Sequence, residues 1–324
     1  MNSSDFEQLN HHRWEEFEKL LTHVEKGRDH PDKQLLPKHF REISADLSLA
    51  QSRMASSHVI DRLNALVIRA YEQIYQNKRG TLDVVMRFIM IDFPIAVRKD
   101  WRLFWLCSVI FWLPFFCMMF SENIDARWVQ AALGPEGMAS MEQMYGGKEQ
   151  QIAHLREEFG SNFMMFSFYI YNNVAIDFRI FAGGILAGLG TCFFLAFNGF
   201  YLGAAAGYVN HAGNPESFWT FVAGHSSYEL LGMIIAGMAG MRIGMAILHP
   251  GRLPRVRALV QGAKQALPLI YGAAMLTTLA ALVEGFWSAE PHPSMVKYAV
   301  GIAGWIGLSA YLICMGRSRK KHAA

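Results

Sequence analysis

Two ionisable residues, His225 and Glu229, lie inside an apolar run that is long enough to cross a lipid bilayer. The run, FWTFVAGHSSYELLGMIIAGMAGMRIGMAIL, extends from Phe218 to Leu248, whereas a spanning helix needs only about 20 mostly apolar residues. An ionisable side chain near the middle of such a helix costs on the order of 3 kcal/mol on insertion scales. Because the two residues are four apart, they share one helix face, which we expect to point into the protein or a wet cavity. Such a pair can conduct protons, bind an ion or dock a partner.

Further polar side chains occur at membrane depth in the two preceding runs. If these runs pack together, the side chains converge on one intramembrane polar cluster, which we predict to contain Asn172, Asn173, Asp177, Asn198, His225 and Glu229. The alternative is a network of interhelical hydrogen bonds that fixes the packing, each bond contributing about 0.6 to 2 kcal/mol. Glu284 and Arg242 lie nearer the ends of their runs, and we predict that they snorkel toward water as anchors.

Signatures of catalysis and of cofactor binding are not found in the sequence. It contains no HExxH zinc motif, no GxSxG nucleophile elbow and no phosphate loop of the required spacing. One His and one Glu are too few for a zinc site, which takes three protein ligands and a water. The four cysteines show no metal-ligand or disulfide spacing, and the N-terminal basic residues are mixed with acids rather than gathered into a nucleic-acid patch. We therefore predict that the protein is not an enzyme and that it binds no metal ion, no cofactor and no nucleic acid.

The elements that must position the polar residues fall into two unlike parts. Residues 1–100 are rich in charge, and their apolar positions follow helical spacing. Pro31 and Pro37 separate the first helix from the second, which predicts a helical hairpin or a three-helix unit. The start of the chain is polar, so we expect no signal peptide and a cytoplasmic N-terminal region. Residues 101–324 carry the long apolar runs and form the predicted transmembrane domain.

The apolar runs predict an all-α, polytopic membrane protein with about six transmembrane helices. The basic residues before the first run and in the tail place both termini in the cytoplasm by the positive-inside rule. The second run is short, so it either crosses fully or re-enters the membrane as a half helix. The segment between the first two runs, Ser121 to Asn162, is predicted to lie outside. The predicted spans are about 103–120, 163–177, 180–209, 218–248, 266–287 and 295–315.

Small residues repeat at intervals of four in the third and fourth runs. Such spacing lets helix backbones approach closely in lipid, and we expect the third and fourth runs to form a tight central pair. The spacing also allows a homo-oligomer, since it does not say whether the contact is within one chain. The predicted packing positions are Gly184, Gly188, Gly199, Gly203, Gly207, Gly237, Gly240 and Gly244.

Four segments taken together resemble the stage II sporulation protein M family. They are LNALVIRAYEQIYQNK, then DFPIAVRKDWR before the first run, then NNVAIDFRIFAGGILAGLGTCFFLAFNGFYLGA, and finally GHSSYELLGMIIAGMAGMRIG. The resemblance covers most of the chain from about Leu63 onward. It implies family positions at Asn173, Asn198, Gly199, His225, Glu229, Gly237 and Gly240.

The resemblance implies a multi-pass protein of the bacterial cytoplasmic (inner) membrane without catalytic chemistry of its own. The namesake of the family resembles a scaffold that recruits peptidoglycan-degrading partners in spore formers. This chain departs from it by a charged N-terminal region of about a hundred residues, typical of a longer branch that also occurs in bacteria that do not sporulate. We therefore expect a scaffold for envelope or peptidoglycan-remodelling proteins, with the lipid bilayer and other membrane or cell-wall proteins as partners. The alternative is a transporter or channel that uses an intramembrane site of His, Glu and Asn side chains.

Overall fold

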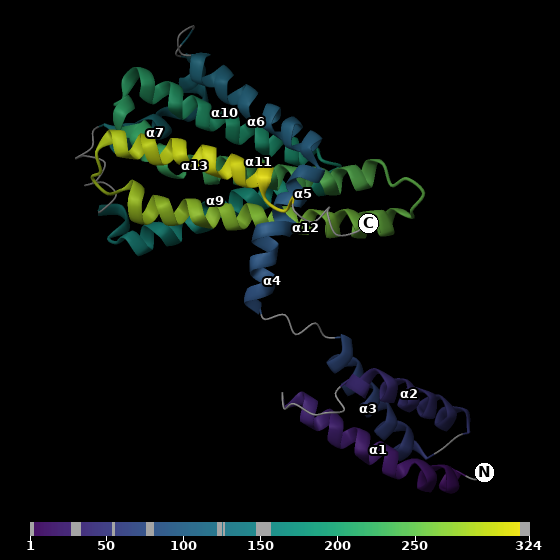
Figure 1. The fold of residues 1–324 in the computed structure, drawn as a ribbon. Helices are drawn as coiled ribbons and strands as arrows, with labels where there is room; N and C mark the ends of the chain where they lie inside the picture. The colour runs from purple at the N-terminus through teal and green to yellow at the C-terminus, as the bar shows by residue number, and fades with distance from the viewer. Residues whose placement is uncertain are drawn as a thin grey trace. The chain divides into compact units, whose positions relative to one another are not determined.

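The computed structural model describes residues 3–26, 34–53, 56–75, 81–121, 125, 127–146 and 157–317, and every regular element in them is helical. The chain divides into two compact units, one up to Asp83 and one from Val84 onward, and each is described by itself (Figure 1). Residues 84–99 therefore belong to the same unit as the apolar helices. The tail beyond residue 317 and residues 147–156 of the predicted outer segment lie outside the described residues.

The described part of the first unit, up to residue 75, contains three helices, which is the second of the two arrangements that the sequence predicts. They are α1 (Ser3–Glu25), α2 (Leu36–Ser52) and α3 (Ser57–Tyr75). Their apolar stripes meet in a core that includes Trp14, Leu21, Ile43, Leu63 and Leu66, each nearly inaccessible to solvent. Burial of these stripes provides the main stabilisation of the unit, because short helices are marginal alone in water.

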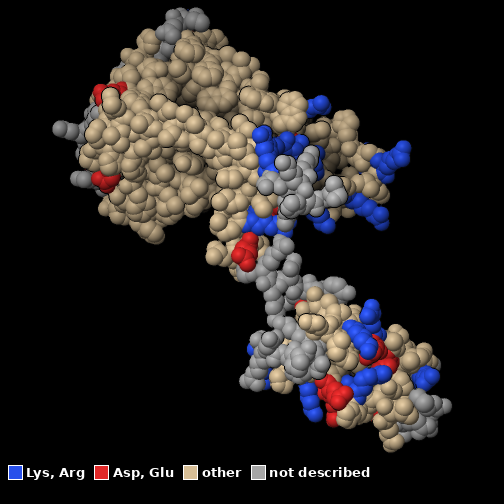
Figure 2. All heavy atoms as spheres, in the orientation of Figure 1, with Lys and Arg blue, Asp and Glu red and all other residues tan. Residues whose placement is uncertain are grey.

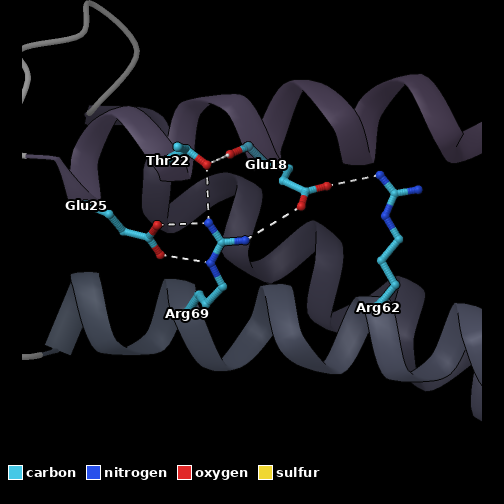
Figure 3. Close-up of polar contacts among 5 residues, drawn as sticks. All are labelled: Glu18, Thr22, Glu25, Arg62 and Arg69. Carbon is cyan, nitrogen blue, oxygen red and sulfur yellow. Dashed lines mark hydrogen bonds and ion pairs between the residues drawn. The ribbon is translucent and has the colours of Figure 1, made fainter.

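Charged side chains join α1 to α3 and α2 across the rim of this core. Arg69 of α3 donates from Nε and Nη2 to the two carboxylate oxygens of Glu25, at 2.9 and 2.8 Å, and Arg62 donates to Glu18 at 3.1 Å (Figure 3). Asp46 of α2 is buried and accepts hydrogen bonds from Arg13 and from the indole nitrogen of Trp14 on α1. Each buried polar group at this rim therefore helps to fix how the three helices meet.

The second unit is a bundle built around one long helix. Its elements are α4 (Thr81–Arg87), a π-helix (Phe88–Asp92), α5 (Phe93–Lys99), α6 (Trp101–Ser121), α7 (Arg127–Tyr145), α9 (Asn162–Ala182), a 3-10 turn (Gly183–Ile185), α10 (Leu189–Ala212), α11 (Pro215–Leu248), α12 (Arg255–Val283), a second π-helix, η4 (Glu284–Ser288), and α13 (Ser294–Cys314). α11 lies at the centre and packs against α6, α9, α10, α12 and α13.

Five helices of the described chain are long and apolar enough to cross a membrane. They are Trp101–Ser121, Leu189–His211, Pro215–Leu248, Arg255–Ser288 and Ser294–Cys314. Their outward faces carry large exposed apolar side chains such as Trp105, Phe193 and Ile302, which suits contact with lipid tails. The all-α, polytopic membrane fold predicted from the sequence is confirmed.

The second predicted run differs from the helix that the structure contains. The sequence predicts a short run over 163–177, but α9 is an unbroken helix of 21 residues that continues to Ala182, and the chain turns at 183–188 before α10. Gly188 adopts a left-handed φ of 85° there, a conformation that favours glycine. The predicted run ends at 177 because Asp177 is charged, but the structure buries Asp177 inside the bundle.

α9 extends along the bundle rather than ending halfway. Near its start Phe166 packs against Gly285, in its last part Asp177 contacts Thr277, and the carbonyl oxygen of Ile180 lies beside Gly240. The half-helix alternative is therefore not what the structure shows. α9 is not among the five strongly apolar helices, in keeping with its two asparagines and its charges.

The glycine repeats mark close helix contacts, although one partner differs from the prediction. Gly199, Gly203 and Gly207 of α10 face Phe111, Phe115 and Met119 of α6 in the same order, so α6 and α10 run parallel in direct backbone contact. The tight pairing of the third run through these glycines is thus with the first run, not with the fourth. The spacing of glycines shows that another helix backbone can approach closely, but it does not show which helix that is.

The other glycines of the set pack around α11. Gly184 and Gly188, in the turn after α9, abut Gly240 and Gly244 of α11, and Gly237 faces Leu195 and Cys107. In these places a Cβ would collide with a neighbouring helix or turn.

The charges of the second unit are separated between its two ends. On the face that Figure 2 shows, Lys and Arg gather at the end that holds the α11–α12 loop, and Asp and Glu appear at the opposite end. Two contacts bring other elements to the basic end: Arg242 of α11 pairs with Asp100 before α6, and Arg98 donates to the carbonyl oxygens of Leu312 and Met315 at the end of α13. The basic residues of these elements include Arg98, Lys99, Arg102, Arg252, Arg255 and Arg257.

Candidate functional site

The candidate site lies where α11 meets the end of α12. His225 and Glu229 share one face of α11, as predicted, and the Nε2 of His225 lies 3.8 Å from Glu229 Oε2. The same nitrogen lies 3.8 Å from Oε1 of Glu284, at the start of η4. His225 and Glu284 are buried, with side chains only 4% and 6% exposed, and Glu229 is 16% exposed. One imidazole thus faces two carboxylates in the interior of the unit.

Glu284 is the functional candidate that sequence reasoning placed wrongly. We predicted an anchor that snorkels to water, but the side chain is buried and turned toward His225. Arg242, the other predicted anchor, is partly exposed and forms an ion pair with the buried Asp100.

The wide turn of η4 and the start of α13 hold the imidazole from its other side. Ser288, the last residue of η4, places its Oγ 3.1 Å from His225 Nδ1. The buried Lys297 of α13 donates to the backbone oxygen of Ser288 at 2.6 Å. Glu284 and Ser288 therefore reach His225 from one turn, and His225 has a polar neighbour at each ring nitrogen.

A cavity of about 650 Å³ leads to these three side chains. Its walls come from α6, α7, α10, α11 and α13 and are mainly aromatic, including Phe116, Trp219, Tyr298 and Trp305. His225, Glu229 and Glu284 supply its ionisable side chains near the imidazole, and Ser226 adds a hydroxyl. The cavity is lined by the end of α6 and the starts of α11 and α13, so it lies in the half of the unit opposite the basic end.

The remaining predicted cluster residues do not all join this site. Asp177 of α9 is buried and accepts a hydrogen bond from Thr277 Oγ1 at 2.5 Å, and it lies against Gly232, one turn from Glu229. Asn173 is buried on the same α9 face and accepts a hydrogen bond from the exposed Asn172. The hydrogen bond between Asp177 and Thr277 is a second polar contact, which joins α9 to α12 beside α11.

Asn198 lies apart from both groups of contacts. Its side chain donates back to the carbonyl oxygen of Phe194 in its own helix, at 2.7 Å. The transporter alternative places a broken helix in the second run, whereas α9 is continuous in the described residues, and Asn198 bonds within its own helix.

The arrangement of His225, Glu229 and Glu284 allows two kinds of chemistry. Each residue offers one ligand atom, and these atoms lie within 4.8 Å of one another. Two carboxylates this close in a buried site either share a proton, so that only one is ionised, or both stay ionised beside a bound cation. The three residues therefore suit either a shared proton or a bound metal ion.

Comparison with known proteins decides the family. The profile of the family "Stage II sporulation protein M" matches residues 103–289, more than half of the chain. The chain belongs to the stage II sporulation protein M family. The matched range includes all three residues of the candidate site and the parallel α6–α10 contact. The resemblance inferred from the four sequence segments is confirmed.

A second profile matches the N-terminal unit. Residues 4–76 match a profile described as "Domain of unknown function (DUF8413)". The chain is also similar to "Uncharacterized protein MJ0793" of Methanocaldococcus jannaschii, at 34% identity over 73 residues, which are 22% of this chain and 41% of that protein. The chain thus covers about two fifths of the length of that curated relative. No solved structure matches the chain.

Proposed function

We propose that this protein is a non-enzymatic membrane scaffold that holds envelope or peptidoglycan-remodelling proteins at the inner membrane of a bacterium. The cavity between α6, α11 and α13 is the observation that carries the proposal. Aromatic side chains dominate interfaces in which a few anchor residues provide most of the binding energy, and the walls of this cavity offer such side chains at Phe116, Trp219 and Trp305. Its occupant would be an apolar membrane-embedded segment of a partner protein.

The separation of charge supports an orientation for this scaffold. Cytoplasmic loops carry an excess of Lys and Arg, so the end with the α11–α12 loop would face the cytoplasm, together with both chain termini. The cavity lies in the opposite half of the unit and would then open toward the cell wall, where peptidoglycan-remodelling proteins act. The three-helix unit would offer a separate docking surface on the cytoplasmic side.

Site-specific photocrosslinking in native membranes tests the proposal. A photoreactive phenylalanine analogue is placed at Phe116, which lines the cavity and is 46% exposed. The matched control is Phe193 of α10, which is 63% exposed and does not line the cavity. We expect a defined protein adduct from position 116, identified by mass spectrometry as an envelope or cell-wall protein, and lipid adducts alone from position 193.

A substitution that narrows the cavity provides a second test. Ala223→Phe on α11 introduces a bulky ring at a position that lines the cavity, and it should abolish the adduct at position 116 while the protein still reaches the membrane. Lipid adducts alone at both positions in the unsubstituted protein would contradict the proposal.

A further inference from the structure

Glu284 has a carboxylate oxygen for which the described structure provides no partner. Its Oε1 faces His225, but Oε2 is buried and has no hydrogen-bond partner among the described residues. A buried polar atom without a partner costs about 1 to 3 kcal/mol, and more if it is charged. The side chain is 5% exposed and lines the cavity, so this oxygen marks a place where a further group is required.

The neighbouring atoms define what that group can be. Glu229 and Glu284 bring two carboxylates beside one imidazole, and all three ligand atoms lie within 4.8 Å of one another. At ligand distances of about 2.0 Å, tetrahedral coordination sets ligand atoms roughly 3.3 Å apart. Because His225 Nε2 is 3.8 Å from each carboxylate, small side-chain rotations would bring the three atoms to those distances.

The geometry points to a divalent transition-metal ion, of the zinc class, bound by His225, Glu229 and Glu284. Imidazole and carboxylate ligands suit zinc, and the two carboxylates balance its charge. The sequence offers only the first two ligands on one helix, and η4 of the neighbouring helix supplies the third. This inference goes beyond the proposed scaffold role and does not depend on it.

The surroundings of His225 fit a metal ligand in a second respect. A histidine that binds a metal through one ring nitrogen usually donates the other N–H to a nearby oxygen, which fixes the tautomer and the ring orientation. Ser288 Oγ lies 3.1 Å from Nδ1, and Lys297 holds the backbone of the same serine. Nδ1 can therefore carry the proton, which leaves the Nε2 lone pair directed toward the two carboxylates.

Three protein ligands leave one position of a tetrahedral ion open. Such a position is typical of sites where a metal binds a water or an exchangeable ligand, whereas structural zinc sites are closed by four protein ligands. The cavity reaches all three side chains, so it provides both an entry path for the ion and room for a fourth ligand. The ion would also tie α11 to the end of α12.

Metal analysis of the purified intact protein tests the inference. The protein is stripped with a chelator in detergent and titrated with zinc, and bound metal is measured by mass spectrometry. We expect one ion per chain and a loss of affinity of more than about tenfold in His225→Ala, Glu229→Gln and Glu284→Gln. Ser288→Ala should weaken binding by about 10- to 100-fold. His292→Ala and Glu290→Gln, which alter a His and an acid beside the same turn, should bind as the unaltered protein does.

Two further measurements keep the test valid if a variant fails to fold. X-ray absorption of the zinc-loaded unaltered protein should show only nitrogen and oxygen ligands, whereas sulfur ligands would place the ion on cysteines and overturn the inference. In the presence of chelator, Glu284→Gln should melt at a higher temperature than the unaltered protein, because the substitution removes a buried carboxylate. In the presence of zinc the order should reverse, and the unaltered protein should melt at a higher temperature than Glu284→Gln. No zinc-dependent shift in the unaltered protein, or equal shifts in both, would also overturn it.

Discussion

Replacing Gly203 with alanine tests the parallel contact between α6 and α10 at the middle of its three glycine levels. A Cβ on Gly203 would overlap the carbonyl oxygen of Phe115 and lie 2.8 Å from that residue's carbonyl carbon and Cα. These are backbone atoms, so no side-chain rotation relieves the overlap. Because ordinary contact begins at 3.4 Å, the two helices must separate locally by at least about 0.6 Å, the difference between the two distances.

The expected cost follows from this separation. A gap of 0.5 to 1 Å forfeits roughly a quarter to a half of the dispersion energy of each contact that it opens, and the levels at Gly199 and Gly207 open with it. Overpacking of a close-packed site costs about 1 to 3 kcal/mol, and a clash between backbones belongs at the upper end. Alanine regains about 1 kcal/mol through its higher helix propensity. We therefore expect a net destabilisation of about 2 kcal/mol.

Thermal unfolding of the purified protein in detergent measures this cost. The matched control is Gly307→Ala on α13, where an added Cβ meets nothing within 4 Å, so helix propensity alone should act and the melting temperature should stay the same or rise. Gly203→Ala should lower it. A similar rise in both variants would refute the inferred backbone contact between α6 and α10.

Three further predictions concern polar contacts. Asp46→Ala leaves the buried indole N–H of Trp14 without its acceptor and removes the ion pair with Arg13, so it should destabilise the three-helix unit by about 1 to 3 kcal/mol, seen as faster hydrogen exchange over residues 3–75 of the intact protein. The hydrogen bond from Arg69 lowers the pKa of Glu25, so this pair stabilises above the ordinary carboxylate pKa and loses its effect as the pH falls through the lowered value. Glu25→Gln should therefore increase hydrogen exchange near pH 7, by the equivalent of less than about 1 kcal/mol because the pair is partly exposed, and its difference from the unaltered protein should vanish as the pH falls through the lowered pKa of Glu25; a difference that does not shrink in acid would contradict this. Thr277→Val removes the donor to Asp177 and should lower the melting temperature by the equivalent of about 1 to 3 kcal/mol, whereas Thr278→Val, which alters a hydroxyl bonded within its own helix, should have a smaller effect.

The sequence allowed the elements to be predicted better than their partners. Long apolar runs identify membrane helices because their side chains must either pack inside the protein or face lipid. α6, α11 and α13 accordingly begin and end within a few residues of the predicted runs. The predicted break between the second and third runs lies at 177, about five residues before the end of α9, because the prediction treats the charge of Asp177 as a sign of exposure. Asp177 is buried, with Thr277 as its donor, and that partner is 100 residues away in the chain.

The candidate site was half predicted for the same reason. The spacing of His225 and Glu229 on one helix places them on one face, and the structure shows them together. Glu284 belongs to another helix, and its inward orientation depends on how α11 and α12 pack and on the π turn at the end of α12. Neither property can be read from spacing along one segment. Asn198 shows the converse, because a polar residue at the expected depth bonds to its own backbone.

The π turn at Glu284–Ser288 has a consequence for the phase of the chain that follows it. A π-helix closes its hydrogen bonds over five residues instead of four, so it contains one residue more than the α-helical turn it replaces. Each residue of an α-helix advances the side chains by about 100° around the axis. If these five residues wound as a regular α-helix with none removed, the side chains that follow would advance by about one residue's 100° around the axis, and Ser288 would turn away from His225 although every polar group remained in the chain. The winding of this turn is therefore as much a determinant of the site as the identity of its residues.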